Sequence, residues 1–242
     1  MISARRMSLT LLALPALSLV AAGLVPSLAG AASKHATVAS VLKAANAALL
    51  SEDSVHVSVS TLSGKVASSV IADIGKSSGR ESYRSGAESF AISVTPTYAY
   101  LSGSKEGLIK LMDLTVDEQK KVGTEAIAMK KGSTPYTTFD SNLTSSTFSN
   151  LLPKAKGTTL LTKRDAATGG YQLSWKETAT SSAPASTTVI TISAGKKALP
   201  IKESVTTAEG TSKTTFTQWG ESVDVKAPAA TVAYATVFPT TK

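Results

Sequence analysis

Short stretches that alternate apolar and polar residues recur along most of this chain, and they restrict its fold more than any other feature. The first reads SVHVSVSTL (54–62) and places valine at every second position. A period of two is that of a strand with one buried and one wet face. With weaker runs near 80–84, 125–130 and 158–163, the pattern predicts about eleven strands in a mainly antiparallel sheet. The other clear runs are KVASSVIADI, ESFAISV, TYAYLS, GYQLSWKET, TTVITISA, LPIKESVTT and SKTTFTQW.

Helical spacing of apolar residues is found in three places. Between 37 and 53 an apolar stripe begins after Thr37, a suitable cap. The insertion at 104–123 contains a T-x-x-E capping box that begins at Thr115. A third, short helix is expected within 141–153, capped by Thr144 and stopped by Pro153. The fold class is therefore predicted as α+β.

The first 31 residues have the layout of a secretory signal peptide. Two arginines precede an apolar run that Pro15 interrupts, and small residues lead to a cleavage site at Ala31. The alternative is a membrane anchor, which Pro15 and the small-residue end disfavour. We expect a signal peptide at 1–31, a single domain at 32–228 and a flexible tail at 229–242.

The residues before the cleavage site also resemble the beginning of a bacterial lipobox. Leu28-Ala29-Gly30 precedes Ala31, where a cysteine that becomes acylated would stand. The chain has no cysteine at all, so neither a thioether lipid nor thiol chemistry is available. A lipobox without its cysteine and a plain cleavage site both remain open. In either case we expect an exported protein, secreted or in the cell envelope, without a lipid anchor.

The net charge of +8 comes from lysines and arginines that are scattered along the chain. Nucleic-acid binding would require a basic stripe interleaved with stacking aromatic residues, but aromatic residues make up only 5%. Scattered charge is typical of a solvated surface. It is also compatible with contact to anionic lipid headgroups or acidic wall polymers.

One stretch offers two enzyme signatures. Gly75-Lys76-Ser77-Ser78-Gly79 matches the G-x-S-x-G of a hydrolase elbow, and its first three residues match the end of a P-loop. The hydrolase reading fails because no histidine follows Ser77, and the P-loop reading fails because position 70 is Val70. Two histidines in the whole chain also cannot build a metal site. We therefore expect a turn here, and neither catalysis, nor a metal, nor a cofactor.

A large sheet with few helices leaves part of its apolar face uncovered, and an apolar cavity is the expected result. The insertion at 104–123, with Leu111 and Met112, is predicted to act as a lid. The alternative is that all these residues pack as solid core. The inward residues predicted to line the cavity are Val57, Val59, Val70, Ala72, Ile92, Val94, Tyr100, Leu173 and Trp175.

Three stretches carry a resemblance: SVHVSVSTLSG after the first helix, TPTYAYLSG before the insertion, and TFTQWGESVDVKAPAA near the end. Their order resembles that of the mycobacterial lipid-carrier lipoproteins of the LppX/LprG type, which have a LolA-like fold. The stretch from Phe216 to Pro228 is the most specific. The resemblance implies a curved half-barrel with helices covering its concave face, and a lipid-carrying cavity without catalysis. Ala31 departs from the family's acylated cysteine.

The resulting hypothesis is an exported, non-enzymatic carrier of a lipid or lipid-linked molecule. We expect a monomer that binds a lipophilic small molecule, has a surface suited to membrane contact, and binds no nucleic acid. The alternative is a cell-envelope interaction module with a filled core that binds a protein or a wall polymer through its basic surface.

Overall fold

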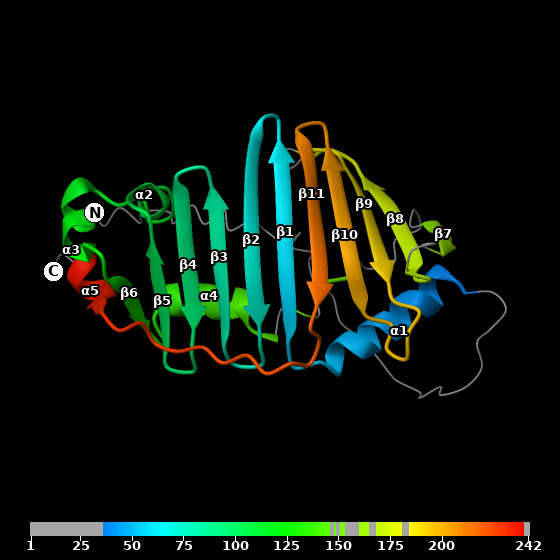
Figure 1. Cartoon of the computed structure of the whole chain (residues 1–242), viewed down its shortest axis with the longest axis horizontal. Helices are drawn as coiled ribbons and strands as arrows, with labels where there is room; N and C mark the ends of the chain where they lie inside the picture. The colour runs from blue at the N-terminus through cyan, green and yellow to red at the C-terminus, as the bar shows by residue number, and fades with distance from the viewer. Residues whose placement is uncertain are drawn as a thin grey trace.

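A computed structural model describes residues 36–145, 148, 151–152, 160–164, 168–180 and 184–239 (Figure 1). The predicted signal peptide and its cleavage site at Ala31 lie outside the described residues. A single sheet of 12 strands dominates the fold. The strands are β1 (Val55–Ser63), β2 (Val66–Ile74), β3 (Gly79–Ser85), β4 (Glu88–Val94), β5 (Tyr98–Gly103), β6 (Ala126–Lys130), β7 (Leu160–Arg164), β8 (Tyr171–Glu177), β9 (Ser186–Ile192), β10 (Pro200–Thr207), β11 (Gly210–Thr217) and β12 (Thr231–Ala233).

The sheet consists of two meanders that join in its middle. The strand order is β12-β6-β5-β4-β3-β2-β1-β11-β10-β9-β8-β7, so β1–β6 and β7–β11 each run through consecutive neighbours. The two meanders meet where β1 pairs antiparallel with β11, from His56–Thr217 to Ser63–Gly210. In Figure 1 β8–β10 are tilted relative to β1 and β2, as in a twisted sheet. The prediction of a mainly antiparallel α+β fold is confirmed.

Five helices accompany the sheet in the part of the chain that the structure describes. Thr37 caps the first helix through a capping box with Ser40, and Thr115 does so for the third with Glu118, as predicted. The helices are α1 (Val38–Leu50), α2 (Lys105–Met112), α3 (Val116–Val122), α4 (Thr134–Leu143) and α5 (Tyr234–Val237).

The position of α4 corrects the start of the helix predicted within 141–153, while its predicted end at Pro153 lies outside the described residues. The helix begins earlier, with Ser133 as its N-cap and Pro135 in its first turn. Thr144, expected to begin a helix, instead ends this one. The sequence TPYTTFDSNL has weak helical periodicity and many hydroxyl side chains, so the stretch reads as a loop. Its burial against the sheet through Tyr136, Phe139 and Leu143 stabilises the helix.

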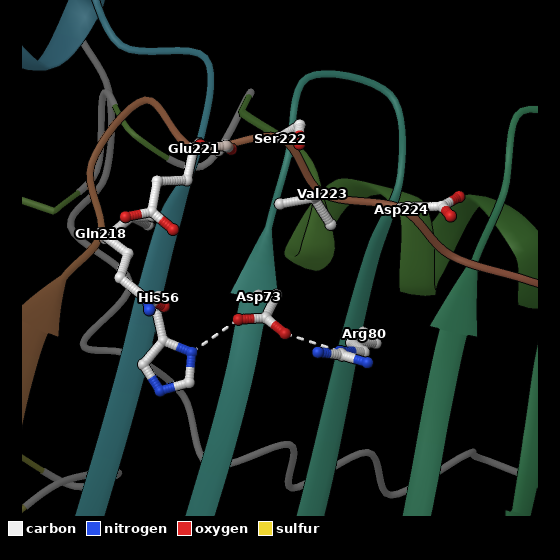
Figure 2. A pocket seen from close by; sticks show the side chains of 10 residues that line it. His56, Asp73, Arg80, Gln218, Glu221, Ser222, Val223 and Asp224 are labelled. Carbon is white, nitrogen blue, oxygen red and sulfur yellow. Dashed lines mark hydrogen bonds and ion pairs between the residues drawn. The ribbon is translucent and has the colours of Figure 1, made fainter.

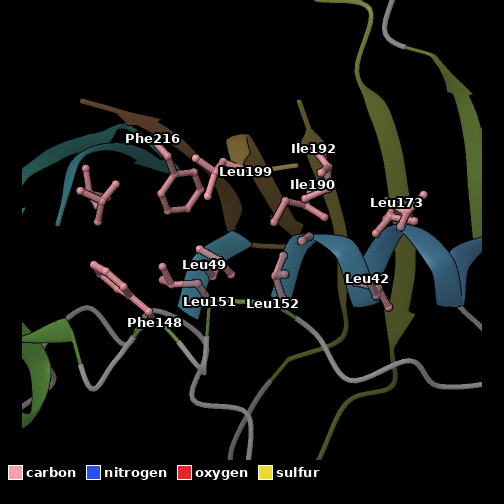
Figure 3. Packing of buried hydrophobic residues seen from close by; sticks show 14 of the residues in the cluster. Leu42, Leu49, Phe148, Leu151, Leu152, Leu173, Ile190, Ile192, Leu199 and Phe216 are labelled. Atoms are coloured by element: carbon pink, nitrogen blue, oxygen red, sulfur yellow. The ribbon is translucent and has the colours of Figure 1, made fainter. Parts of the chain in front are cut away.

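Two hydrophobic clusters lie on the same face of the sheet. The first cluster packs α1 with Phe148, Leu151 and Leu152 against β8, β9, β11 and the ends of β1 and β2 (Figure 3). The second packs α2, α4 and α5 against β4–β6. Strand β3 lies between them and contributes no residue to either cluster. The helices therefore cover one face in two separate blocks, as the resemblance implied for its concave face.

The C-terminal part of the chain corrects the expectation of a flexible tail at 229–242. Residues 218–230 pass the ends of the strands on one side of the sheet, from β11 to the β6 end of the sheet (Figure 1). There β12 pairs in parallel with β6, and Val237 of α5 is fully buried in the second cluster. The stretch is short and rich in Ala and Thr, so its periodicity predicts no strand. It also accounts for the strand beyond the eleven expected.

Candidate functional site

A cavity of about 220 Å³ opens between the two hydrophobic clusters. Its floor is formed by the helix-covered face of β1, β2 and β11, and its sides come from β3, β10 and the end of α4. Directly paired residues of neighbouring strands share a face, and Val57 pairs with Ala72 and Val59 with Val70. The lining residues are Val57, Val59, Thr61, Val70, Ala72, Ile74, Glu81, Asn142, Leu143, Glu203, Val205, Ser212 and Thr214.

The structure places four of the predicted residues in the lining of the cavity and the others outside it, although Leu173 and Trp175 share the first cluster with Val57 and Ala72. Val57, Val59, Val70 and Ala72 line the cavity. Leu173 and Trp175 belong to the first cluster, beneath α1. Ile92, Val94, Leu111 and Met112 belong to the second cluster. These last six residues pack as core, which is what the alternative hypothesis of a solid core expected.

Tyr100 was expected to point inward, and the strand register corrects this. Tyr100 pairs with Ser93, whereas the buried Ile92 pairs with Leu101, so Tyr100 lies on the opposite face from the cavity. It stacks there on Tyr98, with 6.0 Å between ring centroids. Three consecutive residues of β5 are buried, so the sequence lacks the alternation that would indicate which residues face the cavity.

The helix that borders the cavity is α4, not the insertion predicted as a lid. Leu111 and Met112 of α2 pack into the second cluster, while Asn142 and Leu143 of α4 line the cavity. The G-x-S-x-G stretch is the turn between β2 and β3, and Gly75 donates a backbone hydrogen bond to Ser78 (2.9 Å). At Gly79 a Cβ atom would collide with the carbonyl oxygen of Leu143. Glycine at this turn therefore allows the end of α4 to approach the sheet closely.

Two acidic side chains reach the cavity, and the sequence analysis missed both. Glu81 of β3 pairs with Ala72 and Ile92, and Glu203 of β10 pairs with Thr214 and Ile190. Burial raises the pKa of each carboxyl group to about 7. A signal was present for Glu203, because it occupies the position between Ile201 and Val205 in the alternating run LPIKESVTT.

A second, polar pocket of about 210 Å³ lies on the other face of the sheet (Figure 2). His56, Asp73 and Arg80 lie side by side on β1, β2 and β3, with the segment Gln218–Asp224 passing the strand ends. Asp73 accepts hydrogen bonds from His56 Nδ1 and Arg80 Nε, both at 2.6 Å. Burial acts to raise the pKa of Asp73, but the hydrogen bonds from His56 and Arg80 outweigh it and hold the pKa below its usual value.

His56 and Arg80 both bond to Asp73, so the three side chains bind one another and form a structural contact, not a reactive site. The carboxylate of Asp73 is shared between His56 and Arg80, so its charge is neutralised within the sheet. Two serines border the pocket, and Ser54 donates its hydroxyl to the carbonyl of Glu221. Neither serine hydrogen-bonds to His56 in the part of the chain that the structure describes. The arrangement is suited to joining β1, β2 and β3 on this face.

Two further features are absent from the described residues, a metal-binding cluster and a membrane-spanning helix. These residues contain no group of three or more His, Cys, Asp or Glu side chains that could hold a metal ion. They also contain no helix with the length and apolar character needed to cross a bilayer.

Comparison with known proteins gives structural neighbours at low similarity. No protein-family model matches the chain, and no curated protein does. The structure is similar to LprF from Mycobacterium bovis, with 15% identity and a TM-score of 0.48 over 78% of this chain and 96% of that one. It is also similar to the Mycobacterium tuberculosis lipoprotein LppX, with 15% identity and a TM-score of 0.47 over 77% and 96% of the two chains. At these values the likeness carries no inference about what this chain binds.

Proposed function

We propose that this protein is an exported, non-enzymatic carrier that holds a lipid or another lipophilic molecule in the cavity between the two clusters. The observation that supports the proposal is the cavity over β1 and β2, which the described helices do not fill. Val57 and Val70 are only 2% and 6% exposed, so their side chains are withdrawn from bulk solvent around an unfilled volume. The valine and alanine side chains of the floor favour binding of an apolar group.

The hydrophobic effect would supply most of the binding free energy. Each buried methylene contributes about 0.8 kcal/mol. The volume of 220 Å³ corresponds to roughly seven water molecules at about 30 Å³ each. The cavity therefore fits a short chain or the end of a longer one, and a whole long acyl chain requires α4 to move away from the sheet.

The direct experiment is organic extraction of the purified protein followed by mass spectrometry. A lipophilic compound at near-stoichiometric amount is the expected result. An empty extract, together with no binding of added amphiphiles, contradicts the proposal and favours the interaction module with a filled core.

A matched pair of variants tests whether the ligand occupies this cavity. Val70 and Ile71 are neighbours in β2 and lie on opposite faces; Val70 lines the cavity, and Ile71 is 49% exposed on the other side. Val70→Trp fills the cavity and is expected to reduce the co-purified compound at least tenfold. Ile71→Trp adds the same bulk outside and is expected to leave it unchanged. Equal retention in both variants contradicts the cavity assignment.

A further inference from the structure

Each of the two glutamates of the cavity is paired with at least one apolar residue on the same face of the sheet. Across the row that contains Glu81, the paired residues are Ile92 and Leu101 on one side and Ala72 and Val57 on the other. Glu203 is likewise paired with Ile190 on β9. The two acids stand on opposite sides of a floor made by β2, β1 and β11.

These carboxyl groups lack the partners that other inward or half-buried acids in this protein have. Glu52 pairs with Lys197 and Glu88 with Lys110, each at 2.5 Å. Glu203 is only 8% exposed, yet among the described residues it makes neither a hydrogen bond nor an ion pair. Glu81 makes none there either. None of the described side-chain oxygens is both cut off from solvent and without a partner, so water reaches these two carboxyl groups from the cavity, and a ligand there would take the place of that water.

No other described titratable side chain lines the cavity. Facing Glu81 are Ala72 of β2 and Ile92 of β4, and Tyr83 is the nearest titratable group on the same face of β3. Facing Glu203 are Thr214 of β11 and Ile190 of β9. On α4 the titratable pair is Tyr136 and Asp140, which hydrogen-bond to each other (3.4 Å) and lie outside the lining. The cavity thus contains acids and no basic group among the described residues.

We infer that the cavity selects amphiphiles with a cationic head, an ammonium group joined to an alkyl chain, with Glu203 as the residue that contacts the ammonium. The inference rests on the proposed function, because it specifies the ligand class of the same cavity. The alkyl chain lies on Val57, Val59 and Val70, and the ammonium donates hydrogen bonds to the carboxylate. Glu81, across the floor, adds negative charge to the same volume.

The carboxylate form is required for this contact, and it makes binding depend on pH. Burial raises the pKa of Glu203 and of Glu81 to about 7, so both are mostly protonated at pH 5.5 and ionised at pH 8.5. A primary amine, with a pKa of about 10.4 as in lysine, remains charged at both pH values. Affinity for an alkylammonium ion is therefore expected to rise with pH, in contrast to affinity for a neutral amphiphile of the same length.

The experiment measures binding of n-octylammonium, n-octanol and n-octanoate to the delipidated protein by isothermal titration calorimetry at pH 5.5 and 8.5. At pH 8.5 octylammonium is expected to bind at least about tenfold more tightly than octanol, as a charge-assisted hydrogen bond predicts, and octanoate most weakly. At pH 5.5 the preference is expected to fall to about threefold or less. Glu203→Gln is expected to abolish the preference while leaving octanol binding within about twofold. Glu209→Gln, an exposed glutamate in the β10–β11 turn, is the matched control and is expected to behave like wild type.

The outcomes separate this inference from the proposed function. Equal affinity for octylammonium and octanol, or tighter binding of octanol and octanoate at low pH, overturns the cationic ligand and leaves a lipophilic carrier in place. Binding of none of the three compounds, with an empty organic extract, overturns both. A preference that survives in Glu203→Gln but is lost in Glu81→Gln overturns the assignment of the contact to Glu203.

Discussion

At the scale of single residues, the same chemical group serves different ends according to its neighbours. Asp73 has a pKa held below its usual value because His56 and Arg80 donate hydrogen bonds to its carboxylate, despite partial burial. Glu203 has a pKa raised to about 7 because burial removes water and no partner replaces it. The first group stabilises the ionised form within the sheet. The second disfavours the ionised form, because burial lowers the hydration of the carboxylate.

Replacing Glu203 should therefore stabilise the ligand-free protein at alkaline pH. The folded-state pKa lies above the unfolded value of 4.5, so the native state loses stability as pH rises from 4.5 through about 7. Complete ionisation costs on the order of 3 kcal/mol for a shift of this size. Glu203→Gln is expected to raise the free energy of unfolding by about 1–3 kcal/mol more at pH 8 than at pH 5, measured by urea unfolding. If Glu203→Gln and wild type have the same free energy of unfolding at both pH values, Glu203 is not the source of the pH dependence.

Residue-level prediction from sequence succeeded where alternation was clean and failed where burial interrupted it. In β1 valine alternates with polar residues over 55–60, so the inward position of Val57 could be predicted, and Ala72 of β2 is paired with it. In β5 residues 99–101 are all buried, and Tyr100 was placed on the wrong face. The trio of His56, Asp73 and Arg80 depends on the register between three strands, which periodicity does not determine.

At the scale of elements, the end of α4 borders the cavity through Asn142 and Leu143. Its predicted position was wrong because the helix depends on contacts with distant strands rather than on its own propensity. Its end is fixed at the β2–β3 turn, where Ser145 donates a backbone hydrogen bond to Gly75 (2.8 Å). Gly79 lies close to Leu143 at the same point. A turn that resembles a hydrolase motif therefore serves to seat a helix.

Adding one methyl group at this turn should displace α4. The Cβ of an alanine at position 79 would collide with the backbone carbonyls of Leu143 and Asp73, neither of which is a flexible side-chain end. Gly79→Ala is expected to lower the free energy of unfolding by about 1–3 kcal/mol, as overpacking does, measured by urea unfolding. The control is Gly195→Ala in the β9–β10 loop, where the new Cβ meets only the Ser193 hydroxyl at 3.2 Å. Equal stability of both variants would show that α4 does not rest on this turn.

At the scale of the whole molecule, the single sheet carries two cores that share no buried residue. The first cluster depends on α1, and the second depends on α2, α4 and α5. The described chain connects the two blocks through the sheet and through the segment at 218–230. Because each block buries its own apolar side chains, the two can differ in local stability even though the sheet is continuous.

Shortening one buried side chain of the C-terminal helix α5 should reveal this division into two blocks. Val237 is fully buried in the second cluster, so Val237→Ala is expected to cost about 1–3 kcal/mol. Hydrogen exchange followed by mass spectrometry should show faster exchange in β4–β6 and α2, with little change in β8–β10. Val116→Ala, which truncates a side chain that is 62% exposed, is the control. Uniform loss of protection over the whole sheet would contradict two separable blocks.

The parallel pairing of β12 with β6 has a consequence for how the chain is made. Roughly 100 residues separate the two strands, and at about 5–20 residues per second a ribosome needs several seconds or more to supply them. During that interval the outer side of β6 offers unpaired amides to any neighbouring nascent chain. Strand β12 thus covers an edge of β6 that would otherwise stay open to pairing with another chain, and a chain that lacks β12 is expected to associate through that edge.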